Sequence, residues 1–481
     1  MTYKHSKLSL EKFVFPAVLL LLNFFLKGIF INAGDISGDE PFTIFYSQMD
    51  IPSILSKLSQ GNNPPLFEII LHFWINIWGI SAYSTRFLPL LFSTLTVLFI
   101  YKTGLKFFNI RIAIITSLLF TFSNYHIFFA HEARVYSLFA LLTCISMYSF
   151  LSLLKDKTKR KYFVLLVFSN ALLIYAHFFG FFVLLIQMLS VLRIKEIRQT
   201  IFKKYLLITG ITLLLYLPYI KLLTTRFAAS AKGTWVPAPH FEDIYNNLWK
   251  FSNAPVNTVV FLLFLLTALF FIIVKRNKPS GIPPTYLKVV MNWFIVPYFL
   301  IFILSFLTPM FLDRYLIFIS LGYYFSVAIA INYLGRSERL FYLLSSITVI
   351  LMIITCNPKI DTYRNTGEMV NAIKQHKKEN TVVYLCPDWI DLGFVYHYNI
   401  NFFKDYKQTR NKLNAEKIFP INNAEQVNDS ILSASESVVY LDGWSGLVDK
   451  DNQIFEKLHR SFKNLVTDES FHGYKIYCFT R

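Results

Sequence analysis

The sequence predicts an all-α membrane domain followed by a small α/β domain, and three observations carry this prediction. Hydrophobic residues make up 54% of the 481 residues and charged residues only 16%, a composition too apolar for a soluble protein of this length. Long apolar runs alternate with short basic clusters. From about Asn357 the composition becomes that of a soluble domain. We therefore expect two domains, residues 1–356 and 357–481.

The net charge of +18 does not indicate a nucleic-acid partner. The basic residues adjoin apolar spans instead of forming one face, which is typical of the cytoplasmic loops of membrane proteins. The four cysteines show no metal-binding spacing. Cys386 and Cys478 lie on expected strands and could form a disulfide in an oxidising compartment, whereas Cys144 lies inside an apolar span.

Eleven apolar runs have a length suited to crossing a bilayer as helices. They are residues 13–33, 84–105, 110–130, 135–154, 161–177, 179–193, 205–222, 256–274, 287–307, 314–334 and 339–356. Basic clusters such as Lys155–Lys161 fall at every second connection, so the positive-inside rule places the N-terminus in the cytoplasm. Because the number of spans is odd, we expect residues 357–481 outside the cytoplasm.

One further apolar segment, Pro64–Gly79, is too short for a span and would invert every later loop if it crossed. It carries Glu68 and His72 one helical turn apart. We expect a juxtamembrane helix at the outer interface, with Trp74 and Trp78 at the level of the headgroups.

The tail alternates between helical and strand patterns. Helices are expected over 363–379, 423–434 and 452–464, and strands over 381–387, 437–443 and 474–480. This alternation favours an α/β domain with a mostly parallel sheet.

Carboxylates gather directly after the first span, in the sequence GDISGDEPF. Asp35, Asp39 and Glu40 could supply a general base or a metal ligand there. Helix capping is the alternative for Asp39, because Glu40 and Pro41 resemble the first turn of a helix.

Three other outer connections carry polar residues that lipid and water alone do not explain. His131, Glu132 and Arg134 are packed into four residues, and His177 lies in a tight turn between two spans. Arg314 begins the tenth span beside Tyr315. An arginine there is suited to bidentate phosphate binding, and snorkelling to lipid headgroups is the alternative. Together these loops could hold a lipid-linked phosphate and deprotonate a hydroxyl.

At these residues the chain resembles the polyprenyl-phosphate-sugar-dependent glycosyltransferases of the GT-C fold. It is most similar to the bacterial protein-mannosyltransferase-like group, which includes Rgt-type lipopolysaccharide sugar transferases and aminoarabinose transferases. The similarity covers roughly residues 10–335 and continues into the tail. Its marks are Asp39-Glu40, Asn63-Pro64-Pro65-Leu66, Ser84 to Pro89, His131 to Tyr136, Arg314-Tyr315 and Asp361-Thr362-Tyr363-Arg364.

The resemblance implies roles for these residues. Asp39 would be the catalytic base, and Glu40 would position the acceptor or donor. Arg134 and Arg314 would bind the donor phosphate. Asn63 replaces the common histidine and His131 replaces a common glutamine, so the part played by Asn63 stays open.

Supporting roles would fall to Glu132, His131, His177, Tyr315 and Asn63. No cofactor follows with certainty, and Asp39 and Glu132 could bind a divalent metal ion.

The resemblance also implies the reaction and its place. The donor would be a polyprenyl-phosphate sugar, and the acceptor a cell-envelope glycan, a lipid or a protein. Transfer would invert the anomeric carbon at the outer face of the bacterial cytoplasmic (inner) membrane. A flippase for lipid-linked glycans is the alternative, but it predicts internal repeats and midplane charges, which we do not find.

The orientation is open to a direct test. In a variant that lacks the four native cysteines, Thr158→Cys should be labelled by a membrane-impermeant maleimide only after the cells are opened. Lys450→Cys should be labelled in intact cells, because the charge pattern places residues 357–481 outside. Protection of Lys450→Cys in intact cells would overturn the topology.

Overall fold

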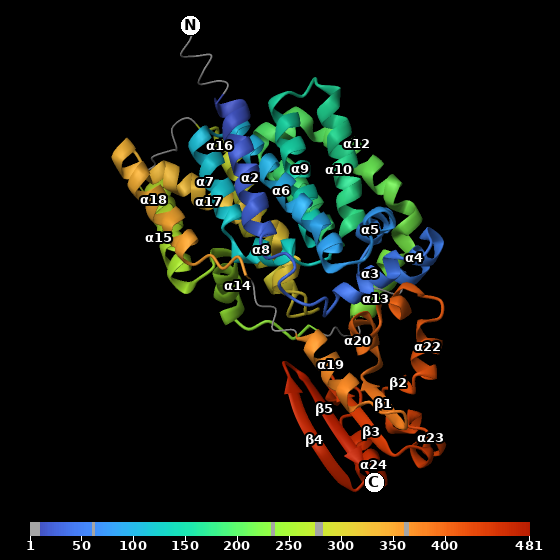
Figure 1. Cartoon of the computed structure of the whole chain (residues 1–481). Helices are drawn as coiled ribbons and strands as arrows, with labels where there is room; N and C mark the ends of the chain where they lie inside the picture. The colour runs from blue at the N-terminus through green and yellow to red at the C-terminus, as the bar shows by residue number, and fades with distance from the viewer. Residues whose placement is uncertain (1–9, 60–62, 232–235, 275–281, 360–364) are drawn as a thin grey trace. The chain divides into compact units, whose positions relative to one another are not determined.

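The computed structural model describes residues 10–59, 63–231, 236–274, 282–359 and 365–481 (Figure 1). The chain divides into two compact units. We call the first the helical unit, which comprises Met1–Ile31, Leu55–Ile70 and Arg86–Ile360. The second, the sheet unit, comprises Asn32–Ile54, Leu71–Thr85 and Asp361–Arg481. The sheet unit therefore takes in two segments from the N-terminal part of the sequence as well as the tail.

The helical unit is built from these elements, of which α6 begins in the sheet unit: η1 (Leu10–Val14), α2 (Phe15–Gly28), α6 (Ala82–Phe107), α7 (Ile110–Thr121), α8 (Asn124–Ala130), α9 (Tyr136–Lys155), α10 (Arg160–Ala176), α11 (Gly180–Arg193), α12 (Lys195–Tyr216), η2 (Leu217–Tyr219), α13 (Ile220–Ala231), α14 (Glu242–Ser252), α15 (Pro255–Ile273), α16 (Pro284–Leu304), η3 (Asp313–Leu316), α17 (Ile317–Leu334) and α18 (Glu338–Ile354). Helices α4 (Ile51–Leu58) and α5 (Leu66–Trp78) are divided between the two units.

Every predicted apolar run contains a helix, and the protein is a multi-pass membrane protein. By length and composition, six helices in the described part of the chain can cross a bilayer. The number rises to seven if the pair α7 and α8, which is bent by 62°, counts as one span. Helices α2, α10, α11 and α18 have 14–17 residues and are shorter than the 18 residues taken as the minimum for a crossing. The count of eleven crossings stays a prediction, and Pro64–Gly79 forms the expected short helix as α5.

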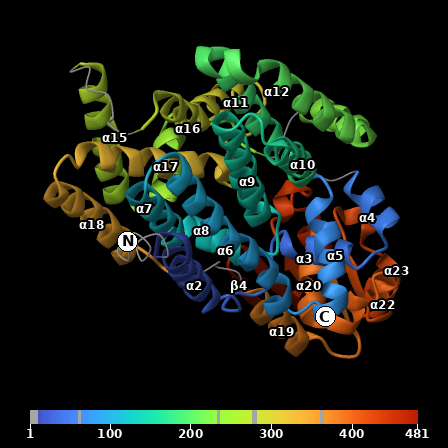
Figure 2. The same cartoon turned by 90° about the horizontal axis from the view of Figure 1, so that it is seen from above.

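Helices α9 and α17 form the centre of the helical unit (Figure 2). In each of these two segments 83% of the residues in the most apolar stretch are buried, whereas in α15 only 22% are. Gly322 of α17 permits close packing, because a Cβ there would lie 3.0 Å from both the Phe294 backbone and the Trp293 side chain of α16. Small residues at such contacts let helix backbones approach each other within a bilayer.

A buried lysine joins α2 to its neighbours in the helical unit. The Lys27 ammonium donates to Ser93 Oγ at 3.1 Å and to the Phe120 carbonyl at 3.3 Å. It also lies 4.0 Å from the centre of the Phe120 ring. Just beyond α2, the Arg86 guanidinium donates to the Ile31 carbonyl at 3.3 Å. These contacts satisfy charges that would otherwise be costly to bury.

The sheet unit contains a five-stranded sheet with the order β2-β1-β3-β5-β4. The strands are β1 (Thr381–Cys386), β2 (Ile418–Pro420), β3 (Ser437–Asp442), β4 (Asn464–Phe471) and β5 (Tyr474–Thr480). Strand β1 is parallel to β2 and β3, and Val383 faces Ile418 and Val439. The β3–β5 and β4–β5 pairs are antiparallel, so the expectation of a mostly parallel sheet was wrong. The cause is a hairpin at His472 and Gly473, whose positive φ angles reverse the chain.

The remaining elements of the sheet unit are α3 (Glu40–Ser47), α19 (Thr366–His376), η4 (Asp388–Ile390), α20 (Asp391–Tyr398), α21 (Ile400–Lys404), α22 (Thr409–Ala415), η5 (Ala424–Gln426), α23 (Asp429–Ala434), η6 (Ser445–Leu447) and α24 (Gln453–Ser461). The expected tail helices thus appear as α19, α23 and α24.

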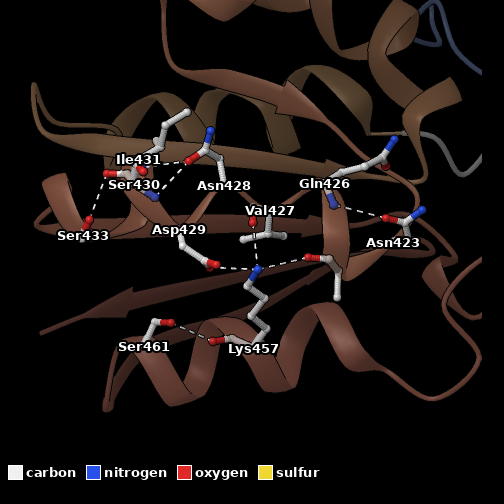
Figure 3. A network of polar contacts seen from close by, with 11 residues as sticks. Asn423, Gln426, Val427, Asn428, Asp429, Ser430, Ile431, Ser433, Lys457 and Ser461 are labelled. Carbon is white, nitrogen blue, oxygen red and sulfur yellow. Dashed lines mark hydrogen bonds and ion pairs between the residues drawn. The ribbon is translucent and has the colours of Figure 1, made fainter.

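One face of the sheet packs on α24. Val382, Tyr384 and Val438 form a core there with Ile454 and Leu458. Figure 3 shows how Lys457 of the same helix fixes the connection before α23. Its ammonium lies 2.9 Å from Asp429 Oδ1 and donates to the carbonyls of Ala424 and Val427.

All four cysteines have free thiols. Cys386 ends β1 and Cys478 lies on β5, with β3 between these two strands. Two strand spacings amount to about 10 Å, which exceeds the reach of a disulfide. The possibility that Cys386 and Cys478 pair is therefore wrong for this fold.

Within the sheet unit, the loop after the first span packs on the tail. Asp35 Oδ2 accepts a hydrogen bond from Gly367 N–H at 2.7 Å, at the first turn of α19. The His397 side chain donates to the Ile36 carbonyl at 2.8 Å. On α3, the Phe45 ring lies 5.3 Å from that of Phe403. These contacts attach α3 to α20 and α21, and a carboxylate at the N-terminus of α19 also favours the helix dipole.

A buried carboxyl on α20 makes the sheet unit sensitive to pH. Asp391 is 8% exposed, and its Oδ2 lies 3.1 Å from an Arg410 nitrogen. Burial raises the pKa of Asp391 to about 6, and Arg410 offsets only part of that effect. Burial and then Asp391 also raise the pKa of Tyr46 on α3.

The folded state should therefore lose stability as the pH rises from about 4 to about 6. In that range the folded carboxyl retains a proton that the unfolded one releases, and the loss amounts to about 3 kcal/mol at most. Asp391→Asn should remove most of this dependence. Hydrogen exchange of residues 388–404 in the full chain, corrected for intrinsic rates, measures it at pH 5 and pH 7.5. Equal pH dependence in Asp391→Asn and the parent protein would contradict the assignment.

Candidate active site

The loop after the first span presents one of its two adjacent acidic side chains and buries the other. Asp39 occupies the N-cap position of α3, but its side chain accepts no capping hydrogen bond. It is partly exposed, whereas Glu40 is 2% exposed and its Oε2 accepts from Ser37 N–H at 3.4 Å. The capping alternative therefore does not account for the Asp39 carboxylate.

The His131–Val135 segment breaks the helical path between α8 and α9. His131 and Glu132 are buried, and Arg134 is half-buried. The His131 ring donates through Nε2 to the Lys27 carbonyl at the end of α2. The Arg134 N–H donates to the Glu132 carbonyl at 2.7 Å, which makes the turn tight. The segment is thus fixed by its own backbone and by α2.

The turn between α10 and α11 holds His177 in one orientation. Its Nδ1 accepts from Phe179 N–H at 3.1 Å, and its ring stacks on Phe139 of α9 at 4.8 Å. Gly180 is required at the end of the turn, because a Cβ there would lie 2.8 Å from the Leu173 carbonyl oxygen. Among the residues that the structure describes, Nε2 has no hydrogen-bond partner.

The protonation of His177 follows from its surroundings. The pKa of His177 is lowered to about 3, mainly by burial and also by the positive charges of Arg134 and Arg314. The ring is therefore neutral at physiological pH. Since Nδ1 is an acceptor, the single ring proton resides on Nε2. His177 thus offers a buried N–H donor in a region of positive potential.

Arg314 approaches the same histidine from η3. Its backbone N–H donates to Asp313 Oδ1 at 2.7 Å, and Asp313 Oδ2 forms an ion pair with Lys250 at 2.7 Å. The adjacent Tyr315 ring stacks on Phe179 at 5.0 Å and lies 5.6 Å from His177. The Arg314 guanidinium carbon is 5.9 Å from the centre of the Tyr315 ring.

Three segments of the helical unit therefore meet at His177. They contribute Arg134, His177 and Arg314 to one group, which we call the arginine–histidine cluster. Its walls are the aromatic rings of Tyr136, Phe139, Phe179 and Tyr315. Aromatic walls exclude water and so strengthen the attraction between the cationic groups and a bound anion.

Asp39 and Glu40 belong to the sheet unit, whereas the cluster belongs to the helical unit. Asn63 is half-buried in a bend just before α5. Within the described ranges, no three His, Cys, Asp or Glu side chains are grouped in a way that could hold a metal ion.

The sequence did not lead us to expect that Lys27 is a buried contact between helices. The signal was present, since a lysine within an otherwise apolar span is unusual.

Comparison with known proteins agrees with the predicted fold. Residues 62–221 match the model of the family described as dolichyl-phosphate-mannose-protein mannosyltransferase. Among curated protein sequences, none is similar to the chain. The crystal structure of ArnT from Cupriavidus metallidurans bound to undecaprenyl phosphate has a TM-score of 0.60 at 9% identity, with 97% of each chain covered.

An archaeal enzyme has a similar fold. The Archaeoglobus fulgidus oligosaccharyltransferase tethered to an acceptor peptide has a TM-score of 0.54 at 10% identity, which covers 98% of this chain and 75% of that one. The chain therefore has the same fold as these proteins, the GT-C fold. The predicted motif at Asp361–Arg364 lies outside the described residues.

Proposed function

We propose that this protein is an integral membrane glycosyltransferase that moves a sugar from a polyprenyl-phosphate donor to an acceptor hydroxyl. The observation that carries the proposal is the arginine–histidine cluster, which combines two cationic groups with a buried N–H donor. The fold supports the same activity, and the matched structures bear undecaprenyl phosphate in one case and an acceptor peptide in another. We place the reaction at the outer face of the bacterial cytoplasmic membrane, on the basis of the charge pattern.

In this proposal Arg134 and Arg314 bind the donor phosphate. The polyprenyl phosphate leaves with increasing negative charge, so fixed cations and N–H donors stabilise the transition state more than the ground state. His177 donates to the phosphate through Nε2, because its other ring nitrogen, Nδ1, accepts the Phe179 N–H. Tyr315 orients Arg314, and Glu132 and His131 fix the turn that presents Arg134.

The proposed base is Asp39. The acceptor oxygen attacks the anomeric carbon as the bond from that carbon to the phosphate oxygen breaks, and Asp39 takes the hydroxyl proton. A single in-line displacement of this kind inverts the anomeric carbon. The buried Glu40, held by Ser37 N–H, would keep the loop in position.

We assign no role to Asn63 and none to a metal ion. The flippase alternative gains no support from the comparisons.

Loss of either arginine should weaken donor binding. A charge-assisted phosphate contact is worth about 1.5–3 kcal/mol, so Arg134→Ala and Arg314→Ala should each raise the Kd for polyprenyl phosphate roughly ten- to 150-fold. The matched control is Arg111→Ala, because Arg111 forms an ion pair with Glu338 away from the cluster. Equilibrium binding to purified protein in nanodiscs measures the effect.

His177→Phe separates phosphate binding from packing. Phenylalanine can still stack on Phe139 but has no Nε2–H, so binding should weaken by less than in the arginine variants. If both arginine variants bind polyprenyl phosphate as the parent protein does, the arginines serve only as lipid anchors.

Replacement of the proposed base should abolish transfer without unfolding the protein. Asp39→Asn keeps the size of the side chain but cannot accept a proton, so the rate should fall about 10²–10⁴-fold while donor binding is unchanged. Asp35→Asn is the matched control in the same loop, because its amide oxygen can still accept the Gly367 N–H. Single-turnover transfer in proteoliposomes measures the rate. Normal turnover by folded Asp39→Asn would move the role of base to Glu40 or Glu132.

A further inference from the structure

A second site lies in the sheet unit, at the carboxyl end of β3. A cavity of about 270 Å³ is lined there by Asp442, Trp444, Ser445, Ser470, Tyr474 and Lys475. Ligand sites in α/β folds commonly lie beyond the carboxyl ends of strands. The volume is just below the range of about 300–1,000 Å³ for pockets that hold drug-sized ligands, so it fits one small ring.

The aromatic wall of this cavity is held by an unfavourable backbone conformation. Trp444 has φ 70° and ψ 42°, the left-handed region that bulky residues rarely adopt. The residue is nevertheless 54% exposed, so burial does not compensate for the strain. Strained residues of this kind concentrate at ligand sites, where the surrounding structure holds them in place.

The opposite hairpin is shaped to the same indole. Gly473 has φ 90°, and a Cβ at this position would lie 2.7 Å from the Trp444 ring. The neighbouring Tyr474 ring lies 5.2 Å from the indole at an angle of 53°. Two separate segments therefore present a broad, solvent-facing aromatic surface in one fixed orientation.

The polar rim carries one charge of each sign. Asp442 and Lys475 are paired in register across β3 and β5. Asp442 Oδ1 accepts the Ser445 N–H at 2.7 Å, which fixes the carboxylate. An anionic ligand would meet this carboxylate, whereas a neutral polyol could donate to it and accept from Lys475. Hydroxyl groups beside a flat apolar ring face are the chemistry of a sugar.

We propose that this cavity binds a single neutral sugar residue, stacked on Trp444 and hydrogen-bonded at its hydroxyls by Asp442 and Lys475. This inference does not depend on the proposed transfer reaction, since it concerns binding to the sheet unit alone. A protein that transfers sugars would use such a site to retain a glycan that carries its acceptor.

Saturation-transfer NMR on the full-length protein in detergent tests the proposal. The probes are the methyl glycosides of glucose, galactose, mannose and N-acetylglucosamine, with methyl phosphate as an anionic probe. At least one glycoside should show transfer, and Trp444→Ala should raise its Kd at least tenfold, as expected for a tryptophan that dominates a contact. Trp389→Ala removes another exposed tryptophan of the sheet unit and should change the Kd less than twofold.

Lys475→Ala is a second test in case Trp444→Ala does not fold. Lys475 is exposed on an edge of the cavity, so its loss should weaken binding without disturbing the fold. Absence of transfer to every glycoside would overturn the proposal. So would an unchanged Kd in both Trp444→Ala and Lys475→Ala, or transfer to methyl phosphate alone.

Discussion

The helical unit depends on one constraint, which is that polar groups removed from water must find partners within the protein. The Lys106 ammonium donates to Ser152 Oγ at 2.6 Å and to the Tyr162 hydroxyl at 2.9 Å, and so joins α6 to α9 and α10. A second network runs through the interior of the bundle. It links Ser146, Asn170, Gln187 and Tyr205, which lie on α9, α10, α11 and α12. The apolar surfaces allow many helix arrangements, and these directional contacts select one.

The arginine–histidine cluster departs from this rule in an informative way. A buried imidazole N–H without a partner destabilises the folded protein, and nearby cationic side chains add to the cost. The aromatic rings around His177 prevent the group from relaxing toward water. A bound anion would accept a hydrogen bond from this donor and would be attracted by the charges of both arginines.

Much of this architecture could be predicted from the sequence. The apolar runs located the helices, and the strands at Thr381, Ser437 and Tyr474 began where the pattern placed them. Strand β4 was missed because its exposed face lacks a clear hydrophobic alternation. The sharing of the sheet unit between the first loop and the tail could not be predicted either, since hydrogen bonds such as that from Gly367 to Asp35 leave no local signal. For the candidate site, sequence identified the polar residues. Only the fold could show that Nε2 of His177 has no hydrogen-bond partner among the described residues and that both arginines influence the ring.

The hydrogen bond from Gly367 N–H to Asp35 also has a consequence for biosynthesis. The two residues are separated by 332 positions in the chain. At translation rates of 5–20 residues per second, roughly 20–60 s pass between the synthesis of the loop and that of its partner. During this interval the segment that carries Asp39 lacks its docking surface on α19 and α20. The newly made protein therefore acquires an ordered first loop only when its chain is almost complete, which delays activity until the last domain has folded.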